Sequence, residues 1–302
     1  MAYKSLDSIV QYCAEHGAAF DEAVLEDDMQ ERDVTREDSL SSMKSMWQAM
    51  KEAASSYDPS LKSASGLSGG QGALMTAYME QGDTLCGPFI NSVIRAALQM
   101  GESNACMKRI VAAPTAGACG VLPAVLIPGC AEFGFEDEKM IRSLYVAAGI
   151  GQVIAERAYI AGALGGCQAE IGSASAMAAG ALVFLKGGSP DMILNAVAIA
   201  LKSLLGLVCD PVAGLVEVPC IKRNVLGAVN ALTSADMALA GIVSFVPADQ
   251  VIDAMKEVGD KMHASLKETS LGGLAASKCN FNNDFSEFLR YNRGKKQNSF
   301  TN

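Results

Sequence analysis

Glycine- and proline-rich breaks divide this chain into apolar segments, and they limit how far any regular element can extend. The breaks lie at Gly66–Gly72, Pro114–Gly120, Gly165–Cys167 and Asp210–Gly214. Both residues interrupt helices, because glycine is conformationally free and proline lacks an amide donor and clashes with the preceding turn. The pattern therefore predicts separate helices joined by irregular loops.

The spacing of apolar residues between the breaks favours helices over strands. Leu6, Ile9 and Cys13 follow a helical period, residues 138–160 read as a long helix, and an apolar stripe runs from Val251 to Leu266. Proline is tolerated at the first position of a helix, so three prolines mark expected helix starts. They are Pro88, Pro190 and Pro247. No alternating run typical of a strand is present, and the sequence predicts an all-α fold.

Composition excludes several classes of protein. Half of the 302 residues are apolar and 19% are charged, which excludes an intrinsically disordered chain. The net charge of −9 comes mostly from residues 20–39, where nine acids and two arginines sum to −7. We interpret that segment as a solvated helix face or linker. No basic face interleaved with aromatic residues is found, so nucleic-acid binding is not expected.

The sequence also predicts where the chain resides and how it is divided. No apolar segment typical of a signal peptide follows Met1–Ser5. The longest uncharged stretch, 110–131, contains three prolines and is expected to form a buried loop and helix rather than a membrane span. We therefore expect a cytoplasmic protein with reduced thiols. Three parts are expected: an N-terminal helical segment with the acidic stretch (1–55), a main domain (56–276) and a polar tail (277–302).

Three cysteines are the best candidates for chemistry. Cys167, Cys209 and Cys220 each stand at a glycine or proline break, where a thiolate can point into a shared pocket. Their spacings of 42 (167 to 209) and 11 (209 to 220) do not match zinc ribbons or ferredoxins. On spacing alone, three buried thiols without a function remain an alternative. The two histidines, His16 and His263, lie in helical patterns away from the breaks.

Five blocks of sequence resemble signatures of one known family. They are Gly66–Gly70, Asn104–Gly117, Gly166–Glu170, Cys209–Cys220 and Glu268–Ala275. Together they resemble the α chain of the iron–sulfur-dependent L-serine dehydratases, over residues 55 to 276. The resemblance implies a helical fold, an oxygen-sensitive [4Fe–4S] cluster and deamination of L-serine to pyruvate and ammonia. It also implies that Cys167, Cys209 and Cys220 are the three cluster ligands, which would leave one iron open as a Lewis acid.

The same motifs point to residues for binding the substrate. The carboxylate of an amino acid needs donors, and convergent backbone amides of the Pro-Thr-Ala-Gly loop can supply them. The candidates are Ser68, Gly69, Gly70, Asn104, Thr115, Ala116, Gly117, Ala118 and Lys202. Lys202, Arg223 and Asn224 flank the cysteine loops and can bind carboxylate or neutralise a cluster, and we expect at least one of them to pair with Asp210 or Glu217.

The chain also departs from the family's pattern. The family has a β portion, fused or separate, with a Ser-Ser-Ser-His-Thr motif thought to bring a catalytic histidine, and this sequence lacks that motif. We therefore expect a separate β chain that contributes the base, hence a hetero-oligomer acting on L-serine. Some members close the fourth iron with a late cysteine. Here only Cys279 is available, and we do not expect it to be a ligand, whereas Cys119 is expected to line the site.

Three alternatives stay open from the sequence. The first is a cysteine desulfidase-type β-eliminase on the same cluster scaffold. The second is pyridoxal-phosphate chemistry with Lys62 as the Schiff base. The third is a non-catalytic subunit that holds a cluster without turnover.

Overall fold

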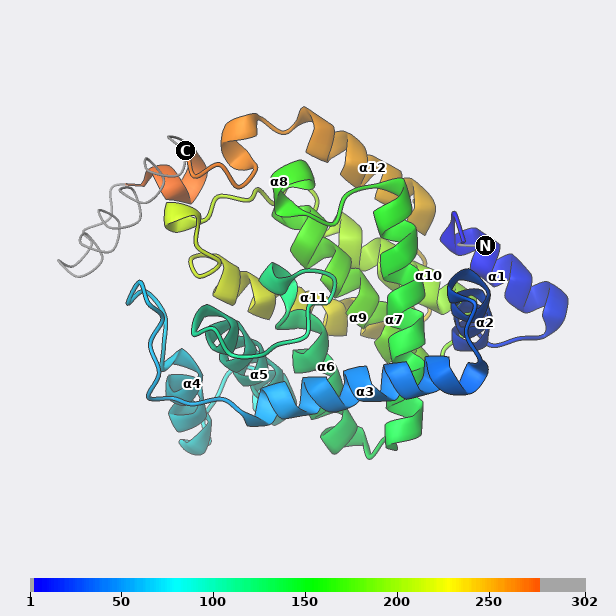
Figure 1. Cartoon of the computed structure of the whole chain (residues 1–302), viewed down its shortest axis with the longest axis horizontal. Helices are drawn as coiled ribbons and strands as arrows, with labels where there is room; N and C mark the ends of the chain where they lie inside the picture. The colour runs from blue at the N-terminus through cyan, green and yellow to red at the C-terminus, as the bar shows by residue number, and fades with distance from the viewer. Residues whose placement is uncertain (1–2, 278–302) are drawn as a thin grey trace.

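Helices make up the regular structure of the part of the chain that the computed structural model describes, residues 3–277 (Figure 1). The α-helices are α1 (Leu6–His16), α2 (Phe20–Arg32), α3 (Arg36–Ser55), α4 (Gln71–Glu80), α5 (Gly87–Ala105), α6 (Val121–Phe133), α7 (Asp137–Arg157), α8 (Gly162–Gly165), α9 (Ser173–Leu185), α10 (Pro190–Lys202), α11 (Cys220–Leu239) and α12 (Ala248–Lys261). Short helical turns are η1 (Ala116–Ala118), the π-helical η2 (Gln168–Gly172), η3 (Val212–Gly214), η4 (Ala264–Leu266) and η5 (Gly273–Ala276). Within the described range the only β pairing is an isolated bridge between Cys209 and Lys267, so the predicted all-α fold is confirmed.

Helix α9 is the centre of the fold. Every residue of this helix except Phe184 is buried, as expected for a helix that is apolar on all sides. Helices α6, α7, α10 and α11 pack around it. Its small residues allow this close approach, because a Cβ at Gly180 would lie only 2.2 Å from the Cδ1 of Ile150 on α7.

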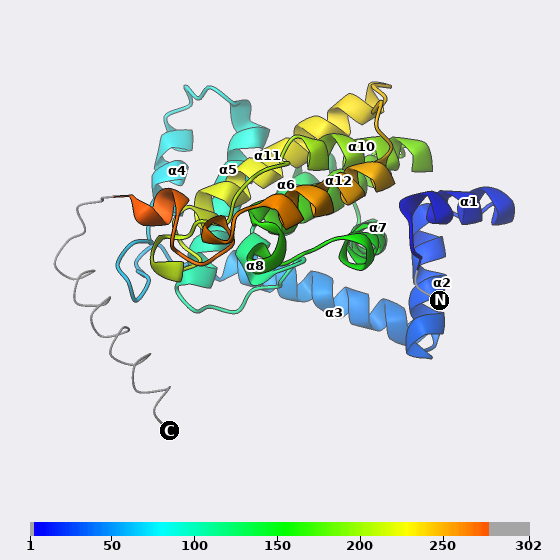
Figure 2. The same ribbon diagram turned by 90° about the horizontal axis from the view of Figure 1, so that it is seen from above.

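The N-terminal helices share this hydrophobic core. Helices α1 and α2 lie at one end of the molecule and α4 at the other (Figures 1 and 2). Leu6, Ile9 and Trp47 belong to the same apolar cluster as α9, and the indole Nε1 of Trp47 donates a 2.8 Å hydrogen bond to Asp137. The expected boundary at residue 55 coincides with the end of α3. Residues on both sides of this boundary belong to the same hydrophobic core. Except for Ser277, the expected tail lies outside the described residues, as does Cys279.

The acidic segment is more than a solvated surface. Asp21 is 2% exposed and Asp27 is 6% exposed. Arg142 on α7 donates to Asp21 at 2.5 Å, and Arg36 and Arg142 both bond to Glu22. The interpretation as a solvated face or linker is therefore wrong for these acids, because the segment forms α2 and packs against α7.

The helix starts expected at the three prolines are confirmed, and one expected helix end is wrong. Pro88 and Pro190 lie in the first turns of α5 and α10, and Pro247 immediately precedes α12. The helix that was expected to carry the apolar stripe as far as Leu266 ends at Lys261, and the backbone of the next residue, Met262, is extended. His263 therefore lies outside the helix. The turn lets the carbonyl of Leu266 accept the amide of Cys209 at 2.8 Å.

Two segments are long and apolar enough to resemble membrane spans by composition. They are 116–133 and 168–185, and 56% and 89% of their residues are buried inside the protein. Both therefore behave as core segments here. The expectation of a loop and helix at 110–131 is confirmed, because η1 lies two residues before α6. The helix is mostly buried, whereas Ala112 and Ala116 in the loop are exposed.

The close packing around α9 can be tested by substituting its glycine. Replacing Gly180 by alanine places a methyl group against Ile150 and should lower the free energy of unfolding by about 1–3 kcal/mol, as other overpacked cores do. Gly129 on α6 is the matched control, because its nearest neighbour is 4.0 Å from the added Cβ. There alanine should be neutral or stabilise by up to about 1 kcal/mol through helix propensity. Urea unfolding of the two variants measures the difference, and equal effects would contradict the packing argument.

Candidate functional site

The three candidate cysteines lie at the ends of elements. Cys167 immediately precedes η2, which continues into α9, while Cys209 lies in the loop after α10 and Cys220 is the first residue of α11. Their exposed fractions are 3%, 4% and 8%. Cys167 and Cys220 therefore occupy helix N-termini, where the partial positive charge of the helix favours a thiolate.

The three thiols share one environment. Burial raises the pKa of Cys167 to about 11 and that of Cys220 to about 12, and it also raises the pKa of Cys209. An ionised Cys167 would raise the pKa of both other thiols further. The three thiols, which lie far apart in the sequence, therefore influence one another's ionisation in the folded chain.

These thiols form a distinctive set of potential ligands. In the part of the chain that the structure describes, no group of three or more His, Cys, Asp or Glu side chains is arranged to hold a single metal ion. A polynuclear iron–sulfur cluster spreads its cysteine ligands around several irons. The donor set of three buried thiols without a histidine therefore fits a cluster better than a mononuclear site.

Glu170 is a site residue to which the sequence analysis gave no role. It lies in η2, and its Oε1 accepts a 2.8 Å hydrogen bond from the hydroxyl of Thr115. Burial raises its pKa, and the Thr115 hydroxyl opposes that shift. A Cβ at Gly162 would lie 2.7 Å from Glu170 Oε2 and 2.8 Å from the Sγ of Cys209, so this glycine lets the backbone approach both groups. The sequence did contain a signal for this residue, because Glu170 lies three residues after Cys167 in the Gly166–Glu170 motif.

Two asparagines hold the turn that contains the candidate substrate residues 115–118. Asn104 at the end of α5 donates to the carbonyl of Ala116 at 3.1 Å. Asn224 on α11 donates to the carbonyl of Gly117 at 2.8 Å and to that of Cys220 at 2.9 Å, which ties the turn to the cysteine helix. Ala118 is completely buried, and its amide donates to the Thr115 carbonyl within the turn.

The other glycine-rich candidate loop is tied to the cysteine segment by a buried carboxylate. The hydroxyls of Ser63 and Ser65 donate to Glu217 at 2.7 and 2.8 Å, three residues before Cys220. Ser68 is 3% exposed, and its hydroxyl has no hydrogen-bond partner within the described range. Gly69 adopts φ +139°, and a Cβ there would lie 2.4 Å from the carbonyl oxygen of Leu61. Only glycine fits that approach. Gly70 follows with φ +81° and is the N-cap of α4.

Some expected residues contact other parts of the molecule. Lys202 is exposed and donates to Ser244 in the loop between α11 and α12, so its role in substrate binding stays a prediction. Cys119 was expected to line the site, which is wrong because it packs in a small apolar cluster with Ala53 and Met100. Lys62 is exposed, and the structure adds no support for a Schiff base there.

Within residues 3–277, neither histidine hydrogen-bonds to Cys167, Cys209 or Cys220. His16 is the last residue of α1, as expected, and its ring stacks on Tyr12. His263 hydrogen-bonds to Ser265. The expectation that at least one of Lys202, Arg223 and Asn224 pairs with Asp210 or Glu217 is confirmed, because Arg223 lies 2.8 Å from Asp210.

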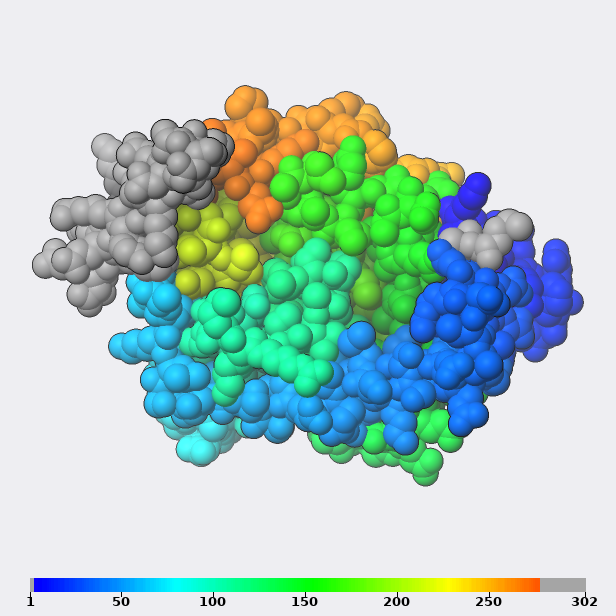
Figure 3. Space-filling view, in the orientation of Figure 1, coloured from blue at the N-terminus to red at the C-terminus, as the bar shows by residue number. Residues whose placement is uncertain are grey.

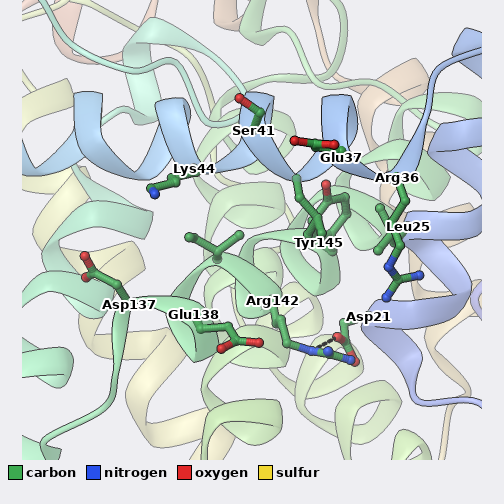
Figure 4. A pocket seen from close by; sticks show the side chains of 12 residues that line it. Asp21, Leu25, Arg36, Glu37, Ser41, Lys44, Asp137, Glu138, Arg142 and Tyr145 are labelled. Atoms are coloured by element: carbon green, nitrogen blue, oxygen red, sulfur yellow. Dashed lines mark hydrogen bonds and ion pairs between the residues drawn. The ribbon is translucent and has the colours of Figure 1, made fainter.

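A cavity of about 900 Å³ lies elsewhere, between α2, α3 and α7 (Figure 4). Leu25, Leu40 and Ile141 provide its apolar lining, and the ion pair of Arg142 with Asp21 lies at one side. It shares no lining residue with the cysteine loops or with η1. The cavity is therefore separate from the cysteine site, despite its size.

Comparison with known proteins agrees with the motifs. The family described as "Serine dehydratase alpha chain" matches residues 15–275. A probable L-serine dehydratase α chain of Bacillus subtilis (strain 168) is 44% identical over 275 residues, covering 91% of this chain and 92% of the relative. The L-serine dehydratase α chain of Peptoniphilus asaccharolyticus is 50% identical over 201 residues, covering 67% and 69% of the two chains.

A longer relative matches only in part. An L-serine dehydratase of Mycobacterium tuberculosis (strain CDC 1551 / Oshkosh) is 49% identical over 184 residues, which are 59% of this chain but 40% of the relative. The match of the family pattern over most of the chain, together with the 44% identity to the Bacillus subtilis α chain, identifies the sequence. This chain belongs to the serine dehydratase α-chain family.

Proposed function

We propose that this chain is the α chain of an L-serine dehydratase, a carbon–nitrogen lyase that converts L-serine to pyruvate and ammonia. We further propose a [4Fe–4S] cluster held by Cys167, Cys209 and Cys220. The observation that carries this proposal is the shared buried environment of three thiols from three separate segments. The names of the relatives support the substrate and the reaction class.

The reaction must break two unreactive bonds of serine, the Cβ–O bond to the hydroxyl and the Cα–H bond. Hydroxide is a poor leaving group, and a bound cluster would supply a Lewis-acidic iron that assists loss of the serine hydroxyl. A positioned base must remove the α-proton in the same site. Loss of water gives aminoacrylate, and its hydrolysis releases ammonia and pyruvate.

Residues of this chain can bind the two charged groups of serine. The carboxylate of Glu170 lies next to the cysteines and is the natural partner for the substrate ammonium, which would also favour its ionised form. Thr115, Ala116 and Gly117 are the partly or fully exposed residues of the neighbouring turn, and we propose that their backbone amides bind the substrate carboxylate. The hydroxyl of Ser68, which has no hydrogen-bond partner within residues 3–277, is a further candidate donor in the loop that Glu217 ties to the cysteine segment.

The proposed base lies on a partner chain. In the described range neither His16 nor His263 hydrogen-bonds to Cys167, Cys209 or Cys220. His16 stacks on Tyr12, and His263 hydrogen-bonds to Ser265. The α-chain names of two relatives, and the extra length of the Mycobacterium tuberculosis relative, support a separate β chain here. We therefore propose a cytoplasmic hetero-oligomer of α and β chains that acts on L-serine.

Loss of a proposed ligand should remove the cluster. We expect Cys167→Ser, Cys209→Ser and Cys220→Ser each to lower the iron content of the anaerobically purified chain to a small fraction of that of the unaltered protein. Cys86→Ser is the matched control, because Cys86 is exposed and unpaired. Iron and sulfide analysis measures the result. Equal iron content in all four variants would rule out the ligand assignment.

Removing the charge of Glu170 should weaken serine binding. A charge-assisted hydrogen bond contributes about 1.5–3 kcal/mol, so Glu170→Gln should raise the KM for L-serine about 10- to 100-fold. Iron content should stay unchanged, which separates this effect from loss of the cluster. Glu138→Gln, on the exposed face of α7, is the control. Steady-state pyruvate formation measures both variants, and an unaltered KM in Glu170→Gln would refute the assigned role.

A further inference from the structure

Arg223 links the segments that carry two of the cysteines. It lies on α11, three residues after Cys220, and its side chain is only 13% exposed. One guanidinium nitrogen donates to the carbonyl of Val208 at 2.7 Å, and another lies 2.8 Å from the carboxylate of Asp210. Val208 and Asp210 are the residues on either side of Cys209. The guanidinium of Arg223 therefore contacts the residue before Cys209 and the residue after it.

The partner of Arg223 is itself fixed by a third segment. The carboxylate of Asp210 is 4% exposed and accepts the amide of Leu274 at 2.7 Å. A Cβ at Gly273 would lie 2.4 Å from Asp210 Oδ2, so the backbone of η5 lies directly against this carboxylate. The residue before Asp210 is held in the same way, because the amide of Cys209 donates to Leu266 and its carbonyl accepts from Glu268.

The surface of the molecule reflects this arrangement. In Figure 3 the yellow surface of the loop that precedes α11 lies beside the orange surface of the segment after α12. The loop with Cys209 is thus held between the first turn of α11 and residues 264–277, with Arg223 and Asp210 between them.

Arginine is the residue type that this contact needs. Its planar guanidinium donates to the Val208 carbonyl with one nitrogen while another pairs with the Asp210 carboxylate, whereas the single ammonium of lysine cannot reproduce this planar geometry. Its charge is also close to the thiols, because Arg223 lowers the pKa of both Cys167 and Cys220 against the effect of burial.

We propose that Arg223 is a positioning residue that clamps the Cys209 segment to the first turn of α11 and so sets the geometry of the cluster ligands. This inference rests on the proposed function in treating the cysteines as ligands. The clamp itself rests only on the contacts of Arg223 with Val208 and Asp210. The two parts can therefore be tested separately.

The clamp is tested by hydrogen–deuterium exchange of the full chain as purified. We expect Arg223→Gln to speed amide exchange in residues 205–219 and 264–277 and to leave α9 protected. Arg223→Lys keeps the charge, loses the fork and should speed exchange in the same segments. Lys222→Gln is the matched control, since the neighbouring Lys222 is exposed on the same helix. Thermal unfolding of each variant shows that the fold is retained.

Two results would overturn the clamp. One is exchange in both Arg223 variants at the rate of Lys222→Gln. The other is slow exchange in Arg223→Lys beside fast exchange in Arg223→Gln, which would assign the effect to charge alone.

A second readout tests the consequence for the cluster. Residues that orient metal ligands typically change metal affinity 10- to 100-fold, so Arg223→Gln should release reconstituted iron to a chelator at least about 10-fold faster than Lys222→Gln. Equal release rates would show that the clamp does not set the ligand geometry. If the unaltered chain takes up no iron, the proposed cluster is wrong, and the exchange experiment still decides whether Arg223 clamps the two segments.

Discussion

The close approach of α11 to the N-terminal end of α9 is the contact on which the candidate site depends. A Cβ at Gly227 on α11 would lie 2.8 Å from the Cγ2 of Ile171 in η2, so glycine at this position lets the two elements meet. Cys167 stands at the start of η2, and Cys220 stands at the start of α11. The packing of two helices therefore brings two thiols from distant parts of the sequence into one buried region.

Polar side chains complete what helix packing begins. Asn224 joins the turn at Thr115 to α11, Glu217 joins the loop at Ser68 to the cysteine segment, and Arg223 joins α11 to the chain around Cys209. Each of these groups is buried or nearly so and is satisfied by partners from another segment. Buried polar groups that lose such partners are costly, so these contacts fix the loops in one arrangement.

The sequence predicts the helices well because their signals are local. Apolar period and proline position identify α5, α7 and α10 without knowledge of the fold. The end of α12 at Lys261 could not be found in this way, since a long-range bond between Leu266 and Cys209 accompanies the turn. The burial of Asp21 is equally invisible in the sequence, because its partner Arg142 lies 121 residues away.

The cysteines of the site could be proposed from motifs, and Arg223 could be named beside them, whereas the role of Glu170 and the detailed contacts of Arg223 could not be predicted. Glu170 and Arg223 acquire their roles through contacts with Thr115 and Asp210, and those contacts exist only after folding. The most direct measurement for the whole account is pyruvate formation from L-serine by the anaerobically purified chain together with its β chain. The account predicts a brown protein whose activity and colour are lost together on exposure to air. A colourless protein that converts L-serine equally well in air would contradict it.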